Sequence, residues 1–99
     1  ILKQGSVFKV REMISMLEEV GMEIVIGHGF GLTPMTIAEI HLASTSKNVL
    51  SAIESVGPYK MVDDIVNLPI EIDSGKIAVP NSPGLGVSID MDKIEKFRV

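Results

Sequence analysis

Two side chains with the chemistry to move a proton each follow a short apolar segment of this 99-residue sequence. His28 comes just after residues 24–26, and Glu54 comes just after residues 49–53. Parallel α/β folds bind ligands at the carboxyl ends of their strands. An imidazole and a carboxylic acid facing one cavity there suit proton transfer, because one abstracts a proton while the other stabilises the developing oxyanion. We expect His28 and Glu54 to be catalytic; the alternatives are a solvated loop histidine and an acid that merely begins a loop.

A glycine-rich loop at residues 27–32 provides the candidate binding surface. We expect Gly27, Gly29 and Phe30 to contact a substrate, because glycine lets the backbone approach a ligand closely. The helix start behind this loop also offers free N–H groups to an anion such as phosphate. A dinucleotide fingerprint requires glycine at relative positions one, three and six, and Leu32 stands at the sixth, so the match is weak.

Other polar residues have simpler interpretations. Lys3 is a candidate strand-end lysine at the same rim, and His41 is expected to be a structural histidine within a packed helix. Asp63 and Asp64 are adjacent carboxylates in a loop, where a solvated turn is commoner than a metal pair. The chain has no cysteine, which excludes a disulfide, a thiolate zinc site and a cysteine nucleophile.

The elements that position these residues alternate between helix and strand. Apolar residues recur at helical spacing from 7 to 20, with Ser6 as the expected N-cap and Gly21 as the residue after the C-cap. The first two residues resemble the end of a strand that leads into this helix. Residues 24–26 are apolar and partly β-branched, which predicts a strand buried on both faces of a parallel sheet.

A second helix and strand follow. Thr33 is the expected N-cap, Pro34 the first helical residue, and the helix is expected to run to about Ser46. This helix is apolar nearly all round, which predicts packing on more than one side. Residues 49–53 are expected to form another buried strand, parallel to the first because βα units cross right-handed. The fold class is therefore α/β.

The chain changes character after Gly57, so we divide it into the last βα units at residues 1–57 and a C-terminal tail at residues 58–99. Alternation across a glycine-containing turn predicts a hairpin in this tail. The expected parts are hairpin strands at 69–72 and 76–80 around residues 73–75, a turn at 83–86, an extended segment at 87–89, and a helical turn from Asp90 to Phe97.

Composition excludes several classes of function. The formal net charge is −4, so the chain has no excess of Lys and Arg for nucleic acid or anionic lipid, and no apolar run is long enough to span a membrane. Cytoplasm is the default expectation. Two and a half βα units leave a sheet edge uncovered, and the chain begins without Met, so we interpret it as the end of a larger protein.

Four segments resemble the C-terminal part of the enolase superfamily, in its mandelate racemase and muconate lactonizing enzyme branch. They are Lys-Gln-Gly-Ser at 3–6, Ala-Glu-Ile-His-Leu-Ala at 38–43, Glu-Ser-Val-Gly-Pro at 54–58, and Pro-Asn-Ser-Pro-Gly-Leu-Gly-Val at 80–87. The resemblance covers essentially the whole chain, and the last segment is its most specific part. It implies the C-terminal part of a (β/α) TIM-like barrel, from the end of strand six to strand eight. The β-hairpin tail would pack on an N-terminal capping domain.

The resemblance also implies a chemistry. Such enzymes use Mg²⁺ held by strands three to five, outside this chain, and their strand-six catalytic residue would lie just ahead of Ile1. His28 matches the strand-seven base, and Glu54 matches the strand-eight acid that hydrogen-bonds the enolate. Gly57-Pro58 is closer to the cycloisomerase pattern, and Ser6 replaces the usual second glycine. The base would take the α-proton of a carboxylate substrate to give an enediolate.

We therefore expect a C-terminal fragment of a Mg²⁺-dependent racemase, acid-sugar dehydratase or cycloisomerase. Its expected partners are a small-molecule carboxylate, the remainder of the parent chain and further copies in a homo-oligomer, with no nucleic acid and no membrane. The fragment alone is expected to be inactive. The alternatives are a self-contained α/β module that binds an anion at residues 27–33, and an interaction module that pairs two copies through apolar faces.

Overall fold

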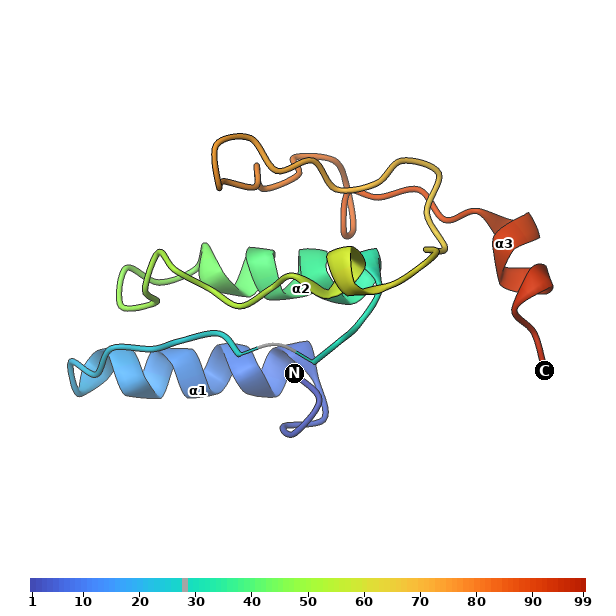
Figure 1. The fold of residues 1–99 in the computed structure, drawn as a ribbon. Helices are drawn as coiled ribbons and strands as arrows, with labels where there is room; N and C mark the ends of the chain where they lie inside the picture. Colours follow the sequence, from blue (N-terminus) through green and yellow to red (C-terminus); the bar gives the residue numbers. More distant parts are fainter. Residues whose placement is uncertain (28) are drawn as a thin grey trace.

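A computed structural model describes residues 1–27 and 29–99. Helix α1 (Val7–Glu19) and helix α2 (Thr33–Ala43) lie side by side, as Figure 1 shows. A short 3-10 helix, η1 (Gly57–Lys60), packs against α2. The tail then runs along the other side of α2 to helix α3 (Met91–Lys96), which projects from the body of the molecule (Figure 1). No helix in the described part of the chain is both long and apolar enough to cross a membrane.

Helix α1 is amphipathic and capped at both ends. The Ser6 side chain accepts a hydrogen bond from the Lys9 N–H at 3.2 Å, as the expected N-cap does. Gly21 has a φ of +71°, and the N–H of the following Met22 donates to the Leu17 carbonyl at 3.0 Å. This glycine closes the helix in a left-handed conformation that other residues adopt at a cost, so both predicted caps are confirmed.

The two predicted strands lie parallel but pair at a single residue each. Ile24 pairs with Val49, and the Leu50 N–H donates to the Ile24 carbonyl at 2.8 Å. The expectation that residues 24–26 are buried on both faces is wrong for this chain. Ile24 and Ile26 pack into the core, whereas Val25 is 54% exposed because no described segment covers the outer face.

Helix α2 is buried nearly all round, as predicted, but its ends differ from the prediction. Thr33 is the first helical residue rather than the N-cap, because the Asp64 carboxylate accepts hydrogen bonds from the Thr33 N–H at 2.9 Å and its hydroxyl at 2.7 Å. The helix ends at Ala43 instead of Ser46. The Ser44 and Thr45 hydroxyls donate to nearby helix carbonyls at 2.7 Å each, which satisfies the last turn without extending it.

The tail forms the predicted turns with little strand pairing. The hairpin is reduced to one antiparallel bridge between Asp73 and Lys76, with Ser74 and Gly75 both at positive φ as a tight two-residue turn requires. The predicted strands on either side are extended chain, and the tail has a second antiparallel bridge between residues 66 and 89.

Helix α3 is capped as predicted and ends one residue earlier than expected. The Asp90 carboxylate accepts from the N–H groups of Asp92 and Lys93, at 3.1 Å each. Lys96 forms an ion pair with Asp63 at 3.0 Å, and the hydrogen bond within this pair lowers the pKa of the Asp63 carboxyl below its usual value. This contact ties α3 to the loop that follows η1.

Candidate functional site

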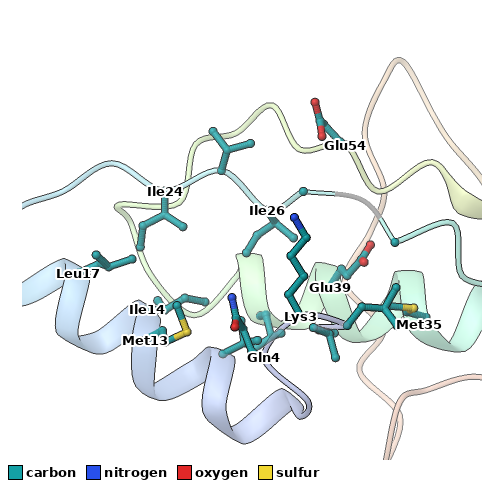
Figure 2. A pocket seen from close by; sticks show the side chains of 17 residues that line it. Lys3, Gln4, Met13, Ile14, Leu17, Ile24, Ile26, Met35, Glu39 and Glu54 are labelled. Carbon is teal, nitrogen blue, oxygen red and sulfur yellow. The ribbon is translucent and has the colours of Figure 1, made fainter.

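The candidate site is a cavity of about 530 Å³ between α1, α2 and the segment at 24–27. Its walls are mostly apolar and include Ile14, Ile24 and Leu42 from the core. Charged side chains also line it, and those among the described residues are Lys3, Glu39 and Glu54 (Figure 2). A mostly apolar cavity with a few convergent polar groups is the usual form of a small-molecule site.

Glu54 lies at the edge of this cavity. Its N–H donates to the Ile26 carbonyl at 3.2 Å, which holds Glu54 beside the end of the first extended segment. A Cβ built on Gly27 would lie 3.9 Å from the Glu54 carboxylate oxygen, so the carboxylate stands over this glycine. The side chain is solvent-exposed and belongs to the lining of the cavity (Figure 2). His28 lies outside the described residues.

In the structure Gly27 and Gly29 line the cavity, whereas Phe30 does not. Gly29 lines the cavity, and a Cβ there would come within 2.8 Å of both Leu2 and Met35 side-chain carbons. These atoms are the ends of flexible side chains, so a Cβ at Gly29 would require Leu2 and Met35 to shift. Phe30 is 58% exposed and does not line the cavity; its ring lies 4.8 Å from the Lys60 ammonium of η1. Of the three residues predicted to contact substrate, only Gly27 and Gly29 line the cavity.

Lys3 reaches the cavity from a turn rather than from a strand end. The Gly5 N–H donates to the Ile1 carbonyl at 3.0 Å, and Gly5 has a φ of +83°, so this segment coils ahead of α1. The predicted strand end at residues 1–2 is thus wrong, because the chain turns immediately. The Lys3 side chain nevertheless lines the same cavity as Glu54 (Figure 2).

Glu39, whose side chain lines the cavity from α2, is not among the residues predicted for the site. Glu39 is a charged residue, yet it is only 2% exposed, like the apolar residues beside it in the helix. Its signal in the sequence is a single acidic residue within a helix that is apolar on all sides. A carboxylate in such a place faces either a partner or a cavity.

The other candidates have structural roles. The His41 ring nitrogen lies 3.3 Å from the Leu85 carbonyl, and this contact joins α2 to the tail. Asp64 is the cap of α2 rather than a solvated turn residue, while Asp63 pairs with Lys96. Within the described residues, no group of three His, Cys, Asp or Glu side chains is placed to hold a metal.

A comparison with known sequence families decides the relationship. The sequence model of the enolase C-terminal domain-like family matches residues 1–93. This chain belongs to that family. The resemblance to the mandelate racemase and muconate lactonizing enzyme branch of the enolase superfamily is confirmed by the relatives.

Several relatives in this family are isomerases. Muconate cycloisomerase 1-1 of Acinetobacter lwoffii is 26% identical over 98% of this chain, and N-succinyl-L-Arg/Lys racemase of Bacillus cereus is 27% identical over 100% of it. The muconate lactonizing enzyme structure from Klebsiella pneumoniae matches 98% of this chain with a TM-score of 0.89 and 31% identity. The chain spans 26% of the length of these two sequence relatives and 27% of that structure.

Proposed function

We propose that these residues form the C-terminal part of an isomerase of the cycloisomerase type that acts on a small carboxylate. The main support is the match to a muconate lactonizing enzyme, with a TM-score of 0.89 at 31% identity over 98% of the chain. The activity belongs to a longer protein, in which these residues form part of a (β/α) barrel. The tail at 58–99 would pack on an N-terminal capping domain.

In this proposal Glu54 acts on the charge that develops during proton transfer. Adding one carboxylate of muconate across its conjugated double bond, or removing the α-proton of the lactone in the reverse direction, places negative charge on the oxygens of the other carboxylate, and a carboxylic acid beside them donates a hydrogen bond to this enediolate. Glu54 stands over Gly27 at the rim of a mostly apolar cavity, where we propose that the substrate binds. His28 is proposed as the group that takes the α-proton of the lactone and, in the ring-closing direction, returns it to the α-carbon.

The family implies Mg²⁺, which stabilises an enediolate by binding its oxygens. The described residues do not fit such a site, because they contain no group of three side chains placed to hold a metal. We therefore assign no Mg²⁺ ligand to this chain. The roles proposed for His28 and Glu54 concern the substrate and its protons alone.

The decisive experiment measures cycloisomerase activity of the full-length protein on cis,cis-muconate, followed by the loss of its ultraviolet absorbance. The Glu54→Gln variant keeps the shape of the side chain and removes the acid. We expect kcat to fall at least about 100-fold, which is the usual contribution of a positioned proton donor. Glu12→Gln on the exposed face of α1 is the matched control and should retain activity. Equal rates in the Glu54→Gln variant and the wild type would contradict the assignment.

A racemase is the second candidate, because N-succinyl-L-Arg/Lys racemase aligns with the entire chain at 27% identity. Racemisation also begins with loss of an α-proton, so it leads to solvent exchange at that carbon. Mass spectrometry of N-succinyl-L-lysine incubated with the full-length protein in D₂O would detect the exchange. Deuterium uptake without turnover of muconate would favour the racemase.

A further inference from the structure

A contact between a cation and an aromatic ring joins the loop at 29–32 to the segment at 54–60. The Lys60 ammonium at the end of η1 lies 4.8 Å from the centre of the Phe30 ring. A cation within about 6 Å of a ring centre is attracted by the negative face of the ring. No carboxylate among the described residues forms an ion pair with Lys60, so no ion pair there draws its charge away from the ring.

Phe30 has a backbone conformation that favours glycine. Its φ is +52°, in the left-handed region, where the Cβ of an L residue crowds the following carbonyl oxygen. Gly29 and Gly31 stand on either side of it, yet the residue with this φ is phenylalanine. Such a residue keeps this conformation only where its surroundings hold it. Phe30 is 58% exposed, so burial supplies only part of that hold, and the contact with Lys60 adds to it.

Lys60 has a fixed backbone position because η1 is anchored on two sides. A Cβ at Gly57 would overlap the Gly31 carbonyl oxygen, so the backbones of η1 and the glycine-rich loop are in close contact. The Tyr59 hydroxyl donates to the Ile70 carbonyl at 3.1 Å, which ties η1 to the tail. The cation therefore projects from an anchored element onto a loop with a strained backbone.

Both of the joined segments contribute to the candidate site. Gly29 directly precedes Phe30 and lines the cavity, and Glu54 precedes η1 and lines it too. Relaxation of Phe30 to a negative φ would change the direction of the chain at Gly29. The position of Gly29 relative to Glu54 thus depends on the conformation of Phe30, although neither Phe30 nor Lys60 lines the cavity.

We propose that Lys60 is a positioning residue, which acts through the Phe30 ring to hold the loop at 29–32 in the conformation that shapes the cavity. The contact itself stands on the geometry, whereas its effect on a reaction rests on the proposed function. The positive charge is the property that matters. Lys60→Arg should therefore preserve the contact, because a guanidinium also stacks on aromatic rings, and Lys60→Met should abolish it.

NMR of the full-length protein tests the contact after reductive ¹³C-methylation of its lysines, which keeps their positive charge. The ring current of Phe30 should shift the Lys60 signal upfield, and Lys60→Arg assigns this signal by removing it. Phe30→Leu should return the signal to the position of a solvent-exposed lysine such as Lys9. A Lys60 signal that Phe30→Leu leaves unchanged would overturn the proposal.

Turnover of cis,cis-muconate by the full-length protein tests the positioning role. Lys60→Met should lower kcat/KM about two- to fivefold, the factor that one exposed cation–π contact contributes. Lys60→Arg should keep the wild-type value, and Lys9→Met on the exposed face of α1 is the matched control. In the Phe30→Leu background Lys60→Met should have no further effect, because the ring through which it acts is gone. Losses that multiply fully in the double variant would overturn the positioning role.

Limited proteolysis measures the conformation of the loop without a substrate. Chymotrypsin cleaves after Phe30 only when the loop leaves its folded conformation, so the cleavage rate reports how often it does so. Lys60→Met should raise this rate about two- to fivefold, and Lys60→Arg and Lys9→Met should not. An unchanged rate would overturn the positioning role. A raised rate in a protein whose wild type does not turn over muconate would support the role and count against the proposed function.

Discussion

Gly57 lies where the backbone of η1 touches the loop that precedes α2. A Cβ built on this residue would overlap the Gly31 carbonyl oxygen and come within 3.1 Å of the Thr36 hydroxyl. The neighbouring atoms are mostly backbone and cannot move aside cheaply. This contact fixes η1 against the start of α2, and through it the end of the segment that contains Glu54.

We expect Gly57→Ala to destabilise the protein by about 1–3 kcal/mol, the usual cost of forcing an extra methyl group into a filled space. Urea unfolding followed by circular dichroism measures this change. Gly27→Ala is the matched control, because a Cβ there meets only the Glu54 carboxylate, at an ordinary distance of 3.9 Å. Equal unfolding midpoints for the two variants would contradict this prediction, because they would mean that η1 moves to accommodate the methyl group at little cost.

At the scale of elements, α2 depends on a residue from the tail. Asp64 accepts both hydrogen bonds at the start of this helix from a position 31 residues later in the sequence. The carboxylate also lies near the positive end of the helix dipole. The contact joins the loop after η1 to the helix that provides Glu39.

Asp64→Ala should therefore destabilise the protein by about 1–2 kcal/mol, the range found for loss of an N-cap. Thermal unfolding is the measurement, and Glu71→Ala, an exposed acid without a hydrogen bond among the described residues, is the control. Thr33→Val removes one of the two bonds. When Thr33→Val is combined with Asp64→Ala, the further loss of stability caused by Thr33→Val should largely disappear, because the carboxylate that accepts the hydroxyl hydrogen bond is already absent. Fully additive effects would contradict a cap shared by these two side chains.

At the scale of the whole molecule, the described chain has a small core and little sheet. The core cluster consists of Val10, Ile14, Ile24, Ile26 and Leu42. The outer face of the first extended segment is exposed at Val25, and many large apolar side chains elsewhere are exposed as well. The chain also spans only 26% of the length of the sequence relatives described above.

We accordingly predict that the 99-residue chain alone has no measurable turnover of cis,cis-muconate, at concentrations where the full-length protein is active. The ultraviolet assay described above checks this directly. Turnover by the purified 99-residue chain that Glu54→Gln abolishes would contradict the prediction and would favour a self-contained catalytic module.

The sequence by itself determined the local features of this protein. Helical periodicity with Ser6 and Gly21 predicted α1 and both of its caps, since capping depends on residues next to each other in the chain. The parallel arrangement of residues 24 and 49 followed from the handedness of βα units, and the four family segments predicted the relationship that the comparisons confirmed.

Only the tertiary structure decided which distant residues meet. Two of its contacts join segments far apart in the sequence: Asp64 caps α2, and Gly57 approaches the Gly31 carbonyl. The burial of Glu39 likewise depends on the surrounding fold. Local periodicity and capping patterns cannot predict such contacts, because they involve only residues that are close together in the sequence. Likewise, β-pairing beyond single bridges depends on neighbouring strands, so the alternating residues of the tail predicted strands that the described chain does not form.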